Sequence, residues 1–410
     1  MPTPTALPTP SLPIRGSDLR GLVRLGIAAT LGVTDLVEAM HHTIASGGGI
    51  VWPSPRGRTS GITGFVYGSV RAVTRGVGRG VDALLGAVSR PAGTDAATPQ
   101  REALIGALNG IWGDHLAATG NPLAVRMALR MGGRALDLSC ETGLAAQVAE
   151  PRSRLLVLAH GLCMGDLQWT RQGHDHGQAL ARDLGYTPVY LNYNSGRHVS
   201  QNGREFSALL EQLVARWPVP VDELAILGHS MGGLVARSAC HHAGEQGQRW
   251  LASLSKLVFL GTPHHGAPLE RGGRLVDAAL GLSPYVRPFA RLGKTRSAGI
   301  TDLRFGNLRD ADWQGRNRHS QRHDDRRPTP LPQGVQAYLL AASLAERPGR
   351  VHRAVIGDGL VPLASALGEH RQPELALAVP ASHRHVVSGC GHLDLLCRDE
   401  VSAQLHAWLA

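Results

Sequence analysis

The pattern of hydrophobic and polar positions has one period before about residue 150 and another after it. Before it, apolar residues recur at three- and four-residue spacing, which predicts helices. We expect one from Ser17, a good capping residue, to about Ala45, and a second over roughly 62–88. Further helical segments are expected over 100–118 and 123–131. Residues 15–150 are therefore predicted to form a helical N-terminal region.

Beyond residue 150, short apolar runs alternate with helical patterns. Such runs, bounded by turn residues, suit buried strands of a parallel sheet. The predicted strands cover residues 155–159, 188–193, 224–227, 256–261, 336–342 and 384–388. The alternation predicts an α/β domain over 151–410, with a mostly parallel sheet, right-handed crossovers and helices on both faces.

Two stretches follow neither the helical pattern nor the alternation of strands and helices. Residues 1–14 are rich in proline and threonine, and we expect a disordered tail. Between 267 and 334 the alternation of strands and helices stops, and an apolar helical pattern is followed by a very polar stretch at 315–328. We expect 267–334 to be a helical insertion that acts as a lid, and 315–328 to be a mobile, solvated loop within it. An apolar lid implies a hydrophobic substrate.

Composition narrows the class of protein. The net charge is +10, but the basic residues are arginines except for Lys256 and Lys294. This reflects either genome bias or attraction to an anionic surface; without basic runs interleaved with aromatics, no nucleic-acid partner is expected. Five cysteines at no metal-like spacing predict no metal site, and their odd number indicates either a reducing compartment or incidental thiols. The N-terminal residues lack a secretory pattern and no apolar run reaches about 18 residues, so we expect a cytoplasmic protein, either free in the cytoplasm or peripheral to a membrane.

The sequence Gly228-His-Ser-Met-Gly232 matches Gly-x-Ser-x-Gly between a predicted strand and a predicted helix. In that context Ser230 lies on a turn so tight that side chains two positions away on either side would collide with neighbouring elements. The hydroxyl is then exposed at a helix N-terminus, where negative charge is favoured. A chain with 51 glycines can match the pattern by chance, so its meaning depends on partners elsewhere.

Those partners occur in order. The motifs are His160-Gly-Leu162, Gly228-His-Ser-Met-Gly232, Gly261-Thr-Pro-His-His265, Gly357-Asp-Gly-Leu-Val-Pro362 and Gly391-His-Leu-Asp-Leu395. Together they resemble the α/β-hydrolase superfamily, and within it the lipases and the GPI-inositol-deacylase-like esterases. The resemblance covers about 150–410. It implies Ser230, Asp358 and His392 as a catalytic triad, with the N–H groups of Leu162 and Met231 as the oxyanion hole.

Several residues compete for these roles. His383 and His385 lie before or within the last strand, and Asp394 is too close in sequence to His392 to face it easily. Further candidates are Asp302, Asp310 and Asp312, which fall in the insertion, and Cys163, which belongs to the oxyanion loop. His229, His264 and His265 are predicted to line the substrate pocket.

The sequence thus predicts a serine carboxyl-ester hydrolase that cleaves a hydrophobic acyl ester through an acyl-enzyme, without a cofactor. An acyltransferase or thioesterase with the same triad stays open, because the acceptor site is a matter of shape. A third alternative is a lipid-surface binding protein in which the hydrolase fold is a passive scaffold. The N-terminal helices either pack on protein or lie on a membrane or lipid surface. The oligomeric state is left open.

Overall fold

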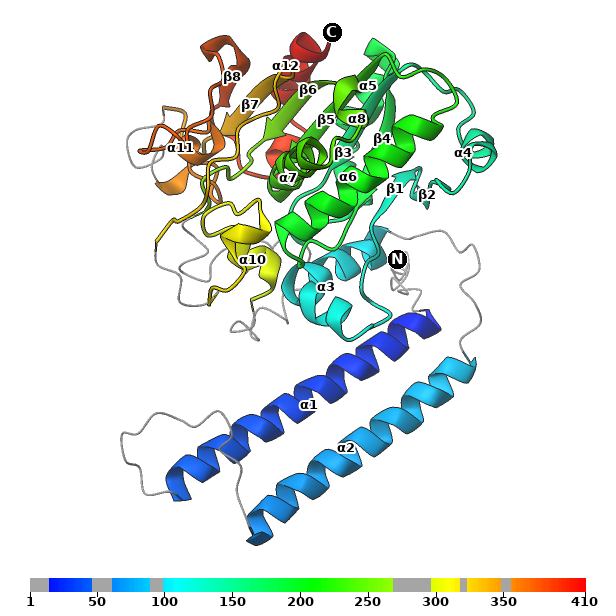
Figure 1. Ribbon diagram of the computed structural model, residues 1–410, viewed down its shortest axis with the longest axis vertical. Coiled ribbons are helices and arrows are strands. Elements are labelled where there is room, and N and C mark those ends of the chain that lie inside the picture. The colour runs from blue at the N-terminus through cyan, green and yellow to red at the C-terminus, as the bar shows by residue number, and fades with distance from the viewer. Residues whose placement is uncertain (1–14, 46–60, 89–98, 268–295, 318–322, 348–354) are drawn as a thin grey trace, which may run out of the picture. The chain divides into compact units, whose positions relative to one another are not determined.

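The computed structural model describes residues 15–45, 61–88, 99–267, 296–317, 323–347 and 355–410 (Figure 1). The chain divides into two compact units, Met1–Ala96 with Ala118–Leu123 and Ala97–Ala117 with Ala124–Ala410. The predicted tail and residues 268–295 of the predicted lid lie outside the described residues. Both expectations therefore stay predictions.

The first unit contains two long helices that confirm the two predicted for this part of the sequence. They are α1 (Gly16–Ala45) and α2 (Gly61–Val88). Arg24 near the start of α1 pairs with Asp82 near the end of α2, with Nε 2.6 Å from Oδ1. Arg71 of α2 pairs with Glu38, which lies late in α1, and this pair is buried. The helices therefore run antiparallel, and ion pairs join them at both ends.

The second unit is built on an eight-stranded sheet in the order β2-β1-β4-β3-β5-β6-β7-β8. The strands are β1 (Ala128–Met131), β2 (Arg134–Ala135), β3 (Arg154–Ala159), β4 (Thr187–Asn192), β5 (Glu223–His229), β6 (Leu254–Leu260), β7 (Gln336–Ala342) and β8 (Arg384–Val387). β3 to β8 pair in parallel, and only β1 and β2 run antiparallel to their neighbours. The six predicted strands are confirmed, and the unit has the α/β-hydrolase fold.

Helices and short turns connect these strands (Figure 1). They are α3 (Pro99–Ala118), α4 (Glu141–Gln147), α5 (His176–Leu184), α6 (Val199–Arg216), α7 (Met231–Gln246), α8 (Trp250–Ser253), α10 (Ala298–Asp302), α11 (Leu363–Ala366) and α12 (Asp399–Leu409), with 3₁₀ turns at Asp166–Trp169, Asp310–Asp312, Ala381–His383 and Asp394–Leu396. None of the described helices combines the length and the apolar character needed to cross a bilayer.

The sheet begins earlier in the sequence than predicted, because β1 and β2 precede residue 151. The helix predicted over 123–131 is wrong for residues 128–131, which form β1 and pair with β4. Gly132 and Gly133 join β1 to β2 with φ values of 55° and 74°. Two successive residues at positive φ form the two-residue turn that the twist of a β-hairpin favours. The Gly-Gly pair was therefore a hairpin signal directly after a segment interpreted as helical.

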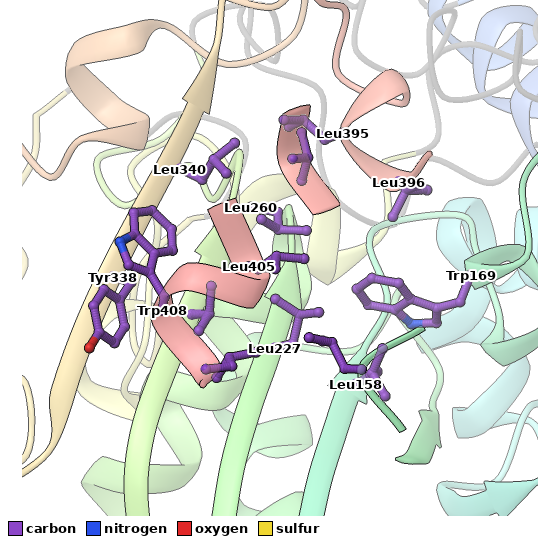
Figure 2. Packing of buried hydrophobic residues seen from close by; sticks show 14 of the residues in the cluster. Leu158, Trp169, Leu227, Leu260, Tyr338, Leu340, Leu395, Leu396, Leu405 and Trp408 are labelled. Atoms are coloured by element: carbon purple, nitrogen blue, oxygen red, sulfur yellow. The ribbon is translucent and has the colours of Figure 1, made fainter. Parts of the chain in front are cut away.

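Alternate strand residues face the two sides of the sheet, and each side is covered by helices. One large cluster combines Leu158, Leu227, Leu260 and Leu340 with residues of α5 and α12. Figure 2 shows Trp408 of α12 against Tyr338 of β7, and their rings stack 5.0 Å apart. Burial of this apolar surface holds the central strands rigid. It thereby fixes their carboxyl ends, where ligand sites of such sheets lie.

Candidate active site

Ser230 occupies the tight turn between β5 and α7, with φ 53° and ψ −124°. Positive φ is costly for a residue with a side chain, and it persists here because the surroundings leave no alternative. A Cβ on Gly228 would lie 2.6 Å from Gly233 Cα, and one on Gly232 would lie 2.1 Å from Ala159 O. Both flanking glycines are therefore required sterically, as the sequence predicted. Ser230 is 9% exposed, so its side chain is only just accessible.

Asp358 and His392 form a buried hydrogen-bonded pair beyond β7 and β8. His392 Nδ1 lies 2.7 Å from Asp358 Oδ2. The other carboxylate oxygen, Oδ1, accepts from the backbone N–H groups of Leu360 (2.9 Å) and Val361 (2.8 Å). His392 N–H also donates to Asp358 O at 3.1 Å. The carboxylate is thus fixed on both sides, and one oxygen is left to orient the imidazole.

Ser230 and His392 line one pocket. It encloses about 430 Å³ of empty space, including the part open to solvent. Its lining is formed by Gly161, Leu162, Met164, His229, Ser230, Pro263, Ala267, Leu303, Leu360, Val361, His392 and Leu393. Apart from the serine and the two histidines, the described lining is apolar or glycine. The described lining therefore combines one serine and two histidines with otherwise apolar surface.

The loop after β3 approaches Ser230 closely. A Cβ on Gly161 would lie 3.1 Å from Ser230 Cβ, so a side chain there would crowd the site. Leu162 follows and lines the pocket. No residue in the described part of the chain accepts from Leu162 N–H. The next N–H, that of Cys163, donates to Ser195 Oγ at 3.1 Å. Met231 is the first residue of α7, so its N–H is one of the groups at the helix N-terminus that have no partner within the helix.

His229 lines the pocket, as predicted from the sequence. Its Nε2 lies 3.2 Å from His392 O. A carbonyl only accepts, so His229 Nε2 carries the proton and Nδ1 is left as an acceptor. Nδ1 is buried and has no partner among the described residues. Burial holds the pKa of His229 well below its usual value, and the neighbouring His392 lowers it further. His229 is therefore a neutral donor that holds the backbone of His392.

His264 and His265, which were predicted to line the substrate pocket, are not among the residues that line the described pocket. The chain turns sharply where His264 N–H donates to Thr262 O at 2.9 Å, so that Pro263 faces the pocket instead. The His264 ring meets the edge of Phe259, 4.8 Å between centroids. Burial lowers the pKa of His264 well below its usual value, and that of His265 to about 3. Both are packing residues beside the site.

The rival acids and histidines are engaged elsewhere. His383 stacks on Tyr338. His385 lies 3.5 Å from Glu400. Asp394 accepts from Gly391 N–H at 3.0 Å. Within the insertion, Asp302 accepts from His198 and Val199, Asp310 from Ser200 and Arg204, and Asp312 from Leu308 and Arg309. Cys163 is buried, which raises the pKa of its thiol to about 12 and keeps it protonated.

Part of the predicted polar loop is anchored rather than solvated. Arg326 donates to the backbone oxygens of His264 (3.1 Å) and Gly306 (2.9 Å), and its side chain is almost fully buried. Arg237 of α7 donates to Thr329 O at 2.7 Å. The Arg326 bonds hold the described end of the insertion against His264, after β6, and against Gly306, and the Arg237 bond ties it to α7, the helix that follows Ser230. Among the described residues, no group of histidine, cysteine or acidic side chains could hold a metal ion.

The sequence did not single out most of the apolar lining. Met164 follows the oxyanion loop, Leu303 follows α10, and Leu393 follows the predicted histidine. Apolar residues are common throughout the chain, so only the folded arrangement distinguishes these. A partial signal existed, because Met164 and Leu393 each lie within two residues of a predicted site residue.

Comparison with known proteins agrees with this geometry. A family model described as the PGAP1-like alpha/beta domain matches residues 174–321, a stretch that includes Ser230. No curated protein matches the sequence. Over residues 174–321 the chain is therefore similar to the PGAP1-like alpha/beta domain, and its sheet has the strand order of an α/β-hydrolase.

Solved structures with similar folds include two lipases and an esterase. The mature form of the Bacillus licheniformis lipase BlEst2 is 17% identical, with 64% of this chain and 95% of that chain covered and a TM-score of 0.42. The Pyrococcus furiosus esterase Pf2001 is 11% identical, with 63% of this chain and 80% of that chain covered and a TM-score of 0.38. The Staphylococcus hyicus lipase is 14% identical, with 63% of this chain and 94% of that chain covered and a TM-score of 0.36. The fold assignment rests on the strand order and the serine turn, not on these similarities.

Proposed function

We propose that this protein is a serine carboxyl-ester hydrolase that cleaves a hydrophobic acyl ester through an acyl-enzyme intermediate. One observation carries the proposal: His392 is bound to Asp358 at 2.7 Å and lines the same pocket as Ser230. A serine hydroxyl is a weak nucleophile until a base removes its proton. Here the base would be an imidazole whose Nδ1–H is already held by a carboxylate, which leaves Nε2 free to accept.

In the first half-reaction, Ser230 Oγ attacks the ester carbonyl and its proton passes to His392 Nε2. Asp358 stabilises the imidazolium that forms. The N–H groups of Leu162 and Met231 stabilise the oxyanion, and loss of one such donor typically costs about 10²–10³ in turnover. The imidazolium then protonates the leaving alcohol, and the acyl group stays on Ser230. In the second half-reaction, His392 deprotonates a water that releases the acid.

The apolar lining supports a hydrophobic acyl group. Leu303, Leu360 and Leu393 face the pocket and offer no hydrogen bond to a polar substrate. An acyltransferase or thioesterase would use the same residues, and product analysis with an added alcohol or thiol distinguishes these activities.

The direct test is covalent. We expect a fluorophosphonate probe to label Ser230 of the full chain, and Ser230→Ala to lose both labelling and hydrolysis of activated esters. A chain-length series of such esters then reports the acyl preference. Full esterase activity in Ser230→Ala would end the proposal. Absence of labelling and of activity in the wild-type protein would instead favour a passive scaffold.

We also propose that α2 places the enzyme on a membrane or lipid surface. Val66, Val70, Val73 and Val77 lie on one side of α2 and are 51%, 42%, 66% and 60% exposed. Isolated exposed apolar residues are ordinary, but four at this spacing form a stripe. Arg71 is buried against Glu38 and is not available to headgroups, which leaves Arg75 and Arg79 exposed.

The surface proposal is tested by co-sedimentation of the full chain with phosphatidylcholine vesicles, with and without phosphatidylglycerol, at low salt. We expect binding that Val70→Asp with Val73→Asp abolishes and that Ala72→Asp, on another side of α2, leaves intact. Failure of the wild-type chain to bind either vesicle would leave these helices a packing role.

A further inference from the structure

Helix α3 presents three glycines to the loops that surround the proposed nucleophile. Gly106 and Gly110 are four residues apart and share one side of the helix, and Gly113 follows a kink at Trp112, whose φ of −129° and ψ of 15° are not helical. A Cβ on Gly106 would lie 2.9 Å from the backbone oxygen of Met164. One on Gly110 would lie 2.2 Å from Cys163 Sγ. The backbone of α3 therefore touches the oxyanion loop with no room for a side chain.

The third glycine meets the other loop at the site. A Cβ on Gly113 would lie 1.8 Å from Asn194 Oδ1. Asn194 Nδ2 donates to Gly113 O at 2.9 Å, and the adjacent Ser195 accepts from Cys163 N–H at 3.1 Å. Cys163 is thus held between α3 on one side and Ser195 on the other. All of these residues belong to the same compact unit.

The loop needs such support because its backbone is strained. Cys163 has φ 60°, in the left-handed region that a residue with a side chain rarely adopts. Such a conformation persists only where the surroundings impose it. Leu162, whose N–H is the proposed oxyanion donor, directly precedes it. Any shift of Cys163 therefore moves Leu162.

Helix α3 is itself fixed in place from a third side. Ser297 Oγ donates to Gly110 O at 2.6 Å, and Ala298 N–H donates to Asp114 Oδ2 at 3.0 Å. Glycine is a poor helix former, so three glycines within one helix oppose helix formation unless close packing requires them. The close approach to Met164, Cys163 and Asn194 is that requirement.

We infer that the glycine face of α3 positions the oxyanion loop, and that Gly110 is a positioning residue for transition-state stabilisation. The inference rests on the proposed ester hydrolysis. An oxyanion donor must lie about 2.7–3.1 Å from the developing charge. A methyl group on Gly110 would lie 2.2 Å from Cys163 Sγ and 2.9 Å from the backbone N and Cα of Cys163, so the loop or the helix must shift. A misplacement of about 1 Å can cost about 10² in rate.

The test compares Gly110→Ala with Gly244→Ala, where a Cβ in α7 would meet nothing within 4 Å. We expect Gly110→Ala to lower kcat about 10²-fold while KM changes little, because ground-state binding does not use the oxyanion donor. Affinity for a boronic-acid transition-state analogue should fall in parallel. Gly244→Ala should retain the wild-type kcat.

A second substitution separates positioning from general damage. Cys163→Gly removes the sulfur, which is the atom nearest to the added methyl group, and leaves the two backbone contacts at 2.9 Å. Glycine also tolerates φ 60°, so the loop can shift at lower cost. In the Gly110→Ala background it should raise kcat at least about tenfold, measured against Cys163→Gly alone in a double-mutant cycle. A folded Gly110→Ala protein with wild-type kcat, or a cycle without coupling, overturns the inference.

Should Gly110→Ala fail to fold, Ser195→Ala decides. It leaves the Cys163 N–H without its acceptor and adds no bulk, so kcat should fall at least about tenfold. An unchanged kcat overturns the inference. If the wild-type protein neither hydrolyses esters nor is labelled at Ser230, the proposed function itself is overturned. If the wild-type protein is active and the Gly110→Ala variant is equally active, only the inference about α3 is overturned.

Discussion

Asp358→Asn tests the central hydrogen bond of the site with a change of almost no volume. The structure dictates how the new amide must orient. Oδ1 of Asp358 accepts from the N–H groups of Leu360 and Val361 at 2.9 and 2.8 Å. Only the carbonyl oxygen of asparagine can take that place, so its NH₂ group must face His392. His392 Nδ1 then becomes an acceptor and Nε2 carries the proton, which leaves the imidazole unable to deprotonate Ser230.

The size of the effect follows from the 2.7 Å between Asp358 Oδ2 and His392 Nδ1. With an effective dielectric constant of about 20, unit charges at that separation attract by roughly 6 kcal/mol. This attraction acts on the imidazolium, which forms only as the reaction proceeds, and a factor of ten in rate corresponds to about 1.4 kcal/mol. The largest loss of rate that this attraction can account for is therefore about 10⁴-fold. We expect kcat to fall about 10³–10⁴-fold, in line with such substitutions in serine–histidine–acid triads.

The assay is steady-state hydrolysis of an activated ester between pH 5 and pH 10, with thermal unfolding to show that the fold is kept. Asp394→Asn is the matched control. Asp394 lies two residues from His392 but accepts from Gly391 N–H at 3.0 Å, and the same bond can be made by an asparagine oxygen. We expect it to stay within about threefold of wild type. A folded Asp358→Asn protein within tenfold of the wild-type kcat would refute the assigned role of Asp358.

Three further predictions concern the surroundings of the triad. His229→Phe keeps a ring but removes the donor to His392 O, so kcat should fall about tenfold, the equivalent of one hydrogen bond to a group left buried. Gly232→Ala places a Cβ 2.1 Å from a backbone oxygen of β3 and should lower the free energy of unfolding by at least about 2 kcal/mol in urea melts. His160 and His176 are buried, and burial lowers the pKa of each to about 4. Their stabilising effect is complete above the unfolded pKa of about 6.5 and is lost as pH falls toward 4, by roughly 2 kcal/mol for each between pH 7 and pH 5 in urea melts.

Each of these has an outcome that contradicts it. An unchanged kcat in His229→Phe would mean that the loop carrying His392 keeps its position without the hydrogen bond from His229 Nε2 to His392 O. Gly232→Ala with wild-type stability would mean that the turn relaxes, and Gly244→Ala is the control because its Cβ meets nothing within 4 Å. Equal stability at pH 5 and pH 7 would mean that His160 and His176 are protonated in the folded protein.

The sequence by itself determined the features whose cause is local. Gly228 and Gly232 are required because of the turn on which Ser230 lies, and a turn is a matter of a few neighbouring residues. The strands were predictable for the same reason, because a short apolar run between turn residues is typical of a buried strand. The order of Asp358 and His392 along the chain followed from the fold that those strands imply.

Tertiary structure alone decided what depends on contacts distant in sequence. Residues 128–131 form a strand rather than a helix because β4 supplies their hydrogen-bond partners. His264 and Pro263 are neighbours, yet only Pro263 reaches the pocket, since the turn between them is set by the ends of β6 and α10. Helix α3 shows the same limit. Its pattern suggested one buried face, but residues Ile105–Gly113 are buried all round, because the loops of the site close over the glycines that leave room for them.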